Sequence, residues 1–293
     1  MHRIQQRRTA DDDHPASYAI FMESLRVLAK DKEILIFPLL SGIVTIIAFI
    51  TMVFAGVTSG VFQHFERRDP LTYAVLFVWY FVSWFIVLFF NVAVIHCASI
   101  RLRGGDPTVA DGFRAATQHL GRIAMWALIS ATVGLILRVI AERANLIGKI
   151  IVGLLGAAWS IATYFIVPVM IFEKRTLRDS VKQSTQLIAK TWGESLVAAG
   201  GIGAFIMLLA FAGLVLPIAA FFISVTAALI ALAVLVIYWI ALSVISAALS
   251  GIFRTALYLY ATEGRTPEGF TPDYVQHAFA PKGGRKALAF RTS

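Results

Sequence analysis

The side chains that could do chemistry inside a membrane are few, and they lie on two long apolar segments. Asn91 and His96 stand five residues apart on one segment, and Ser246, Ser250 and Arg254 stand four residues apart on another. An imidazole can relay a proton, and a stripe of hydroxyls that ends in a cation can line a cavity facing the cytoplasm. The alternatives are a histidine satisfied by a neighbouring helix or by interface water, and small residues that serve close helix packing.

Three cations recur at equivalent places just before apolar segments: Lys30, Arg122 and Lys190. Long basic side chains at such places reach toward anionic lipid headgroups, an attraction of about 1 kcal/mol per cation near the surface. We expect these three residues to contact headgroups. A ring of three cations around a substrate is the alternative.

No sequence pattern points to an enzyme. The chain contains no Walker A, HExxH, GxSxG or CxxC motif, and its single cysteine, Cys97, excludes an intramolecular disulfide. The six histidines lack the spacing of metal ligands, and no paired carboxylates fall within an apolar segment. We therefore expect a non-enzymatic protein, with no catalytic, cofactor-binding or metal-binding residues.

Composition indicates a membrane protein. Of the 293 residues 58% are hydrophobic and 15% are charged, whereas about a quarter of a soluble domain is charged. Six runs are long enough to cross a bilayer as helices, which takes about 20 residues each: 34–57, 71–95, 123–141, 146–172, 195–216 and 219–249. The predicted fold is all-α, a polytopic six-span membrane bundle.

Pro38, Pro168 and Pro217 are expected to break or kink spans, and the turn of the last hairpin is placed at Leu216-Pro217.

Basic residues predict the orientation. Of the 26 lysines and arginines, 21 lie before the first span, between spans two and three, between spans four and five, or after span six; the other side has 5. Because cytoplasmic loops carry the excess of cations, we predict a multi-pass protein of the inner membrane with both termini cytoplasmic. The same rule accounts for the net charge of +9 without nucleic acid. The expected partners are membrane lipids with anionic headgroups; a protein partner or homo-oligomer is left open.

An ungapped internal repeat predicts the domain organisation. Residues 108–122 align with 176–190, and a weaker copy at 21–30 leads into the first span, so that Ser24, Ala116 and Ser184 are equivalent. The prediction is a disordered cytoplasmic N-terminus at 1–16, a membrane domain at 17–262 with parallel repeats at 17–100, 104–172 and 173–262, and a cytoplasmic tail at 263–293. Each repeat is a surface helix followed by a transmembrane hairpin.

The surface helices have defined starts and one apolar face. Both strong copies begin with Thr-x-x-Asp, at Thr108 and at Thr176, where hydroxyl and carboxylate can bond each other's backbone N–H in a variant of the capping box. The expected apolar face of the first strong copy is Val109, Phe113, Ala116, Leu120 and Ile123. We expect these helices to lie half immersed on the cytoplasmic face. They would either cover the bundle ends or serve gating or partner docking.

The segments 167–173, 184–194 and 249–261 resemble a known family. They are similar to DUF6159, a family of uncharacterised six-span prokaryotic membrane proteins, over about residues 17–270. They resemble more distantly the membrane domain of some glycerophosphodiester phosphodiesterases. The resemblance implies an integral membrane protein and carries over no catalytic residue. The expected function is a scaffold or a lipid-organising or partner-binding protein; the alternative is a transporter or channel for a small or lipid-like solute.

Overall fold

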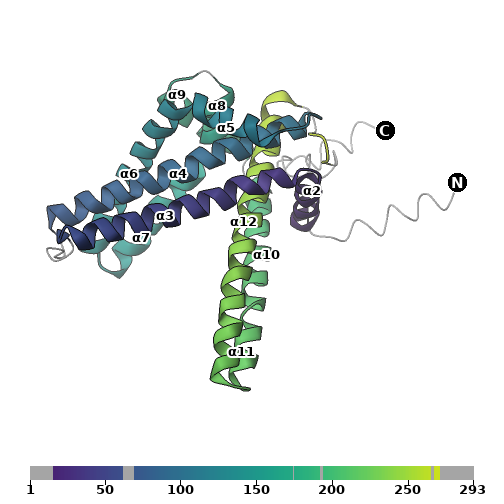
Figure 1. Ribbon diagram of the computed structural model, residues 1–293. Helices are drawn as coiled ribbons and strands as arrows, with labels where there is room; N and C mark the ends of the chain where they lie inside the picture. The colour runs from purple at the N-terminus through teal and green to yellow at the C-terminus, as the bar shows by residue number, and fades with distance from the viewer. Residues whose placement is uncertain (1–15, 62–68, 174, 192–193, 265–266, 271–293) are drawn as a thin grey trace. The chain divides into compact units, whose positions relative to one another are not determined.

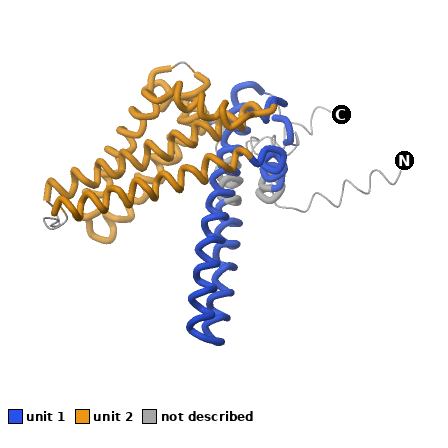
Figure 2. Tube along the Cα trace, viewed as in Figure 1, with its two compact units in different colours: residues 1–32, 101–105, 189–293 blue, residues 33–100, 106–188 orange. Residues whose placement is uncertain are grey.

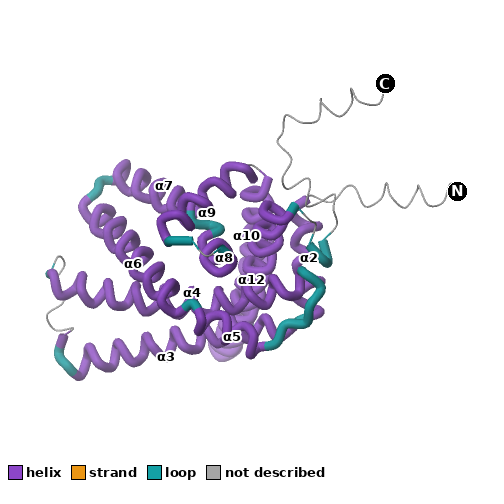
Figure 3. The backbone as a smooth tube through the Cα atoms, turned by 90° about the horizontal axis from the view of Figure 1, so that it is seen from above, coloured by secondary structure: helices purple, strands orange, loops and turns teal. Residues whose placement is uncertain are grey.

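The protein is helical throughout the part that the structure describes. This computed structural model describes residues 16–61, 69–173, 175–191, 194–264 and 267–270, without the side chains of 16–21, 190–191 and 194–202. Within these residues no strand occurs (Figure 3), which confirms the all-α prediction. Nearly all of the two predicted tails, 1–16 and 263–293, lies outside the described residues.

The helices follow one another in the order shown in Figure 1. They are α2 (Ala16–Lys30), the 3₁₀ helix η1 (Lys32–Leu35), α3 (Ile36–Thr58), α4 (Pro70–Leu102), α5 (Val109–Gln118), α6 (Leu120–Arg143), α7 (Leu146–Ala162), α8 (Ile166–Phe172), α9 (Leu177–Thr191), α10 (Glu194–Ala212), α11 (Val215–Phe221) and α12 (Val225–Glu263).

Six described segments are long and apolar enough to cross a membrane. They are Lys32–Thr58, Pro70–Leu102, Leu120–Arg143, Leu146–Phe172, Gly203–Phe221 and Val225–Glu263. Their number agrees with the predicted six spans, and by length and composition the chain is a multi-pass membrane protein. Two helices run well past the predicted span ends: α4 has 33 residues and α12 has 39. At a rise of 1.5 Å per residue, α12 is about 58 Å long, far more than the hydrocarbon core of a bilayer.

Each of the three prolines expected to interrupt a span is the third residue of an α-helix. Pro38 follows η1 in α3, Pro168 follows residues 163–165 in α8, and Pro217 follows residues 213–214 in α11. The first N–H groups of a helix have no intrahelical acceptor, so a proline there loses no hydrogen bond. The interruption therefore falls a few residues before each proline.

The predicted turn of the last hairpin at Leu216-Pro217 is wrong. The chain forms α11 through these residues and turns at 222–224, after which Ser224 caps α12 by accepting from the N–H of Ala227 at 3.1 Å. Pro217 fits the first turn of α11 for the reason given above, so it marks a helix start and not the hairpin. The fifth span therefore ends at Phe221 and the sixth begins at Val225.

The chain forms two compact units (Figure 2). Unit 1 contains residues 1–32, 101–105 and 189–293, and unit 2 contains 33–100 and 106–188. In unit 1, α12 packs against α2, α10 and α11; in unit 2, α6 packs against α7. This division differs from the predicted repeats, which stay a prediction.

The first strong surface helix is shorter than expected. It ends at Gln118, and His119 separates it from α6. Because the backbone at His119 is not helical (φ −108°, ψ 12°), the periodicity of α5 does not continue into α6; Leu120 is 43% exposed, whereas Ala116 and Ile123 are fully buried. The buried face of α5 itself consists of Gly112, Ala115 and Ala116.

Candidate functional site

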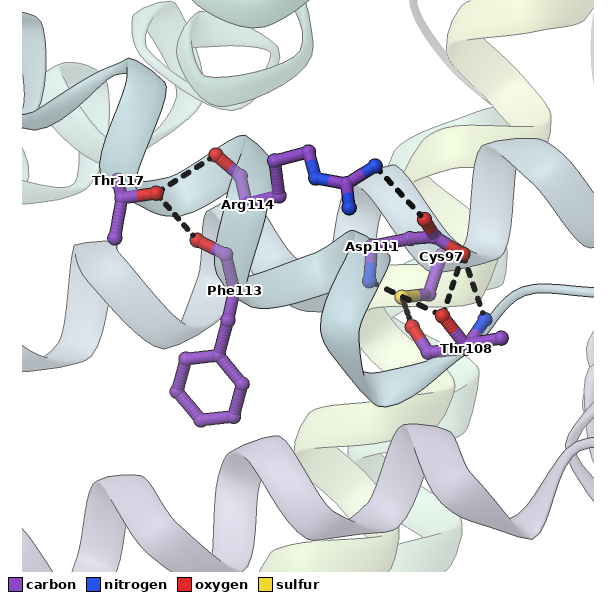
Figure 4. A network of polar contacts seen from close by, with 6 residues as sticks. All are labelled: Cys97, Thr108, Asp111, Phe113, Arg114 and Thr117. Carbon is purple, nitrogen blue, oxygen red and sulfur yellow. Dashed lines mark hydrogen bonds and ion pairs between the residues drawn. The ribbon is translucent and has the colours of Figure 1, made fainter.

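The start of α5 is fixed by the predicted capping box (Figure 4). The Thr108 hydroxyl accepts from the N–H of Asp111 at 3.2 Å, and the Asp111 carboxylate accepts from the N–H of Thr108 at 3.1 Å. The Thr108 hydroxyl also donates to this carboxylate at 2.6 Å. These bonds from the Thr108 side chain and backbone lower the pKa of the Asp111 carboxyl, and the charges of Arg114 and His96 act in the same direction.

The buried face of α5 approaches α3 and α4 closely because it carries a glycine. A methyl group at Gly112 would lie 2.3 Å from Cζ of Phe37 and 3.0 Å from Sγ of Cys97. The Cys97 thiol donates to the carbonyl of Thr108 at 3.6 Å (Figure 4). The ring of Phe113 packs edge-on against Phe37, with centroids 5.6 Å apart. We call this contact of α5 with Phe37 and Cys97 the α5 dock; sequence reasoning missed the role of Gly112.

The second strong surface helix, α9, begins in a related way. The Thr176 hydroxyl donates to the Asp179 carboxylate at 2.6 Å and accepts from the Asp179 N–H at 3.3 Å. Its inner side is buried at Ser180, Ser184, Leu187 and Ile188. Its outer side exposes Arg178, Lys182, Thr185 and Gln186. The helix therefore has one face against the protein and one basic, polar face outside.

Ser184 of α9 bonds to the break in the fourth span. Its hydroxyl donates to the carbonyl of Ala162, the last residue of α7, at 2.7 Å. It accepts from the N–H of Phe165, the residue before α8, at 3.1 Å. Backbone groups inside a membrane must find partners within the protein, and one hydroxyl here serves two of them.

The three predicted headgroup contacts have different surroundings. Arg122 donates through Nη1 to the carbonyl of Met170 in α8 at 2.7 Å, so part of its guanidinium holds the end of a helix. Lys30 is exposed at the end of α2. The side chain of Lys190 lies outside the described residues. Contact with headgroups stays a prediction for all three.

The candidate cavity residues fall on two helices, in separate units. Asn91 and His96 lie on α4 in unit 2, both half-buried. Oδ1 of Asn91 is buried and has no hydrogen-bond partner in the described part of the chain. Ser246, Ser250 and Arg254 lie on α12 in unit 1, all half-buried. The stripe on α12 is present, and its role in lining a cavity stays a prediction.

Sequence reasoning missed two ionic clusters. In unit 1, Arg101 makes a bidentate ion pair with Asp31, whose side chain is only 7% exposed. The exposed pair of Arg103 with Glu263 joins the region after α4 to α12 at 2.6 Å. Only the fold brings residues 31 and 101 together, so no local pattern could have revealed the first pair.

In unit 2, a second cluster joins α4 to the end of α6. Glu142 accepts from the hydroxyl of Tyr73 at 2.9 Å and from Nε of Arg138 at 3.0 Å. Arg138 also donates to the hydroxyl of Tyr80 at 3.2 Å. The one carboxylate and the one guanidinium thus neutralise each other.

The fifth span has a break that is also bonded from a neighbouring helix. Tyr238 of α12 donates to the carbonyl of Leu209 at 2.9 Å, and the indole N–H of Trp239 donates to the carbonyl of Ala210 at 3.1 Å. The N–H of Leu214 donates to the carbonyl of Phe211 at 3.0 Å and not to that of Ala210, four residues earlier, so the Ala210 carbonyl is left without its helical partner. The Leu209 carbonyl also accepts from the N–H of Gly213 at 3.1 Å, so only Trp239, like Ser184, bonds a backbone group that the break releases.

Comparison with known proteins gives a family but no activity. DUF6159, a family of unknown function, matches residues 71–270. The match includes α4 to α12 and both broken spans, and it begins after the first span. No curated protein matches the chain.

Proposed function

Since the chain belongs to the DUF6159 family of unknown function, we propose that it is a non-enzymatic membrane protein that organises anionic lipids at the cytoplasmic face of the inner membrane. The observation that carries this proposal is the two-sided character of α9. Its inner face is buried through Ser180 and Ser184, while Arg178 and Lys182 are exposed on the outer face.

The expected strength follows from the number of cations. Each cation near an anionic surface contributes about 1 kcal/mol. Arg178 and Lys182 together would then contribute about 2 kcal/mol, or about 30-fold in the affinity for an anionic headgroup. On α5, Arg114 is also well exposed, with 71% of its side chain accessible. This attraction weakens with salt because the charges are at the surface.

The test compares two pairs of exposed cations in unit 2. Arg178→Gln with Lys182→Gln removes the proposed contacts; Arg143→Gln with Lys149→Gln removes the same charge at the other end of the spans. Native mass spectrometry from nanodiscs of phosphatidylcholine with phosphatidylglycerol counts the anionic lipids retained. We expect the first pair to lose them and the second to keep them. Equal losses, or no loss from the first pair, would refute the proposal.

The orientation belongs to the same proposal, and the division of 21 against 5 cations supports it. Reporter fusions after Ala144 and after Ser293 should report the periplasm and the cytoplasm, respectively. A C-terminal fusion in the periplasm would place α9 on the wrong side for the proposed lipids.

Transport of a small or lipid-like solute is the second candidate. The breaks at 163–165 and 213–214 favour it, because discontinuous helices form the binding sites of many transporters. Against it, side chains bond carbonyls at both breaks. Release of a fluorescent solute from proteoliposomes, abolished by substitution at one of the breaks, would favour transport over lipid organisation.

A further inference from the structure

The hydrogen bonds around residues 163–165 show what the break requires. In a continuous helix, the N–H of Phe165 would bond Ile161 and that of Ile166 would bond Ala162. Here the N–H of Tyr164 donates to the carbonyl of Ile161 at 3.1 Å, and the N–H of Ile166 donates to that of Thr163 at 3.0 Å. This tighter turn releases the Ala162 carbonyl and the Phe165 N–H.

Ser184 takes up both released groups, and the site is closed to solvent. Ser184 and Phe165 are fully buried, and Ile166, Val167 and Met170 are at most 3% exposed. A buried polar group left without a partner costs its full desolvation energy. The broken form of the span and the docked position of α9 therefore depend on each other.

We propose that Ser184 is a latch that couples the surface helix α9 to the broken fourth span. When α9 is docked, the Ser184 hydroxyl bonds the Ala162 carbonyl and the Phe165 N–H at the break. When α9 moves away from the fourth span, these two bonds are lost and residues 163–165 become accessible to solvent. The outer face of the same helix carries Arg178 and Lys182. In this respect the inference rests on the proposed function: anionic headgroups that bind there hold the latch closed.

Hydrogen exchange measured by mass spectrometry on peptides spanning residues 163–170 tests the latch. The full chain is placed in phosphatidylcholine nanodiscs as wild type, Ser184→Ala and Ser180→Ala. Ser180 is the matched control, since it lies one turn earlier, is 1% exposed, and donates to the carbonyl of Thr176, the residue before α9, at 2.9 Å. We expect about fivefold faster exchange at the Phe165 amide in Ser184→Ala, as the loss of one ordinary hydrogen bond gives, and no change in Ser180→Ala.

A second arm separates the latch from the lipid proposal. Phosphatidylglycerol should slow this exchange in wild type, and Arg178→Gln with Lys182→Gln should remove the lipid effect. Retention of phosphatidylglycerol is counted in the same samples. If no anionic lipid is retained, the proposed function and the coupling to lipid both fall, while the phosphatidylcholine arm still decides the latch. If lipid is retained but exchange stays the same, the coupling alone is refuted.

The latch itself is overturned if Ser184→Ala exchanges like wild type, or if Ser180→Ala accelerates exchange equally. Should Ser184→Ala not survive extraction, thiol labelling in native membranes replaces exchange. Thr163→Cys is placed in a Cys97→Ala background, with and without Ser184→Ala. Faster labelling with Ser184→Ala supports the latch, and equal labelling refutes it.

Discussion

Gly112→Ala tests whether α5 is held against α3 and α4 by direct contact at the α5 dock. The new methyl group would lie 2.3 Å from Cζ and 2.9 Å from Cε1 of Phe37, and 3.0 Å from Sγ of Cys97. Phe37 and Cys97 are at most 1% exposed, so the ring is enclosed on all sides. The helix must therefore move outward, or the core must shift.

Two opposing effects set the magnitude. Replacing glycine by alanine inside a helix stabilises by up to about 1 kcal/mol. Overpacking a well-filled site costs about 1–3 kcal/mol, and the contact with the Phe37 ring places this substitution at the upper end. We expect a net loss of about 1–2 kcal/mol, which lowers the melting temperature of a chain of this size by about 2–8 °C.

Cys97 provides the assay, because it is the only cysteine and is 1% exposed. A thiol-reactive dye that fluoresces on coupling reports unfolding at the α5 dock, and circular dichroism reports the whole chain. Gly121→Ala is the control: a methyl group there meets nothing within 4 Å, so its midpoint should stay the same or rise. Phe37→Leu should partly restore Gly112→Ala. Equal midpoints for Gly112→Ala and Gly121→Ala would show that α5 is not held by close contact at the α5 dock.

Three other predictions concern charges. Asp31→Asn removes the mostly buried carboxylate that pairs with Arg101 and should cost about 3 kcal/mol, whereas Arg103→Gln, in an exposed pair, should cost less than about 1 kcal/mol; equal thermal midpoints would contradict this. The lowered pKa of Asp111 means that its charged form stabilises α5 above the ordinary pKa of about 4 and that this contribution is lost as pH falls through the lowered value. The midpoint difference between wild type and Asp111→Ala should therefore be present at pH 7 and shrink at lower pH; a constant difference refutes it. Phe113→Asp should reduce extracted yield far more than Arg114→Asp, since only the first puts a charge among packed rings; equal yields would show that α5 is not docked.

The features that the sequence predicted correctly depend on local rules. Span number follows from length and hydropathy, and the starts of α5 and α9 follow from threonine and aspartate three residues apart. Pro217 shows the limit of such rules. A proline is compatible with a turn and with the first turn of a helix, and the surrounding chain decides between them.

The features that were missed depend on partners distant in sequence. Gly112 is one glycine among 21, and only its distance to Phe37 shows why a side chain is excluded. Asp31 and Arg101 lie 70 residues apart in the sequence, although they form one ion pair. Trp239 satisfies a carbonyl 29 residues away. Pairings of this kind follow from tertiary packing and leave no periodic pattern.

Three positions that the predicted repeats make equivalent have the same burial and different hydrogen bonding. Ser24, Ala116 and Ser184 are all fully buried, as expected if each surface helix presents the same small residue to the protein. The hydrogen bonding at these three positions differs. Ser184 serves a broken span, Ala116 lies on an apolar face, and Oγ of Ser24 has no hydrogen-bond partner among the described residues. If the three predicted repeats share an origin, the small size of the side chain has been kept at this position while its hydrogen bonding has diverged. Ser24→Ala should then be tolerated, or stabilise, in a thermal melt, whereas Ser184→Ala should destabilise; a larger loss from Ser24→Ala would overturn this view of the repeat.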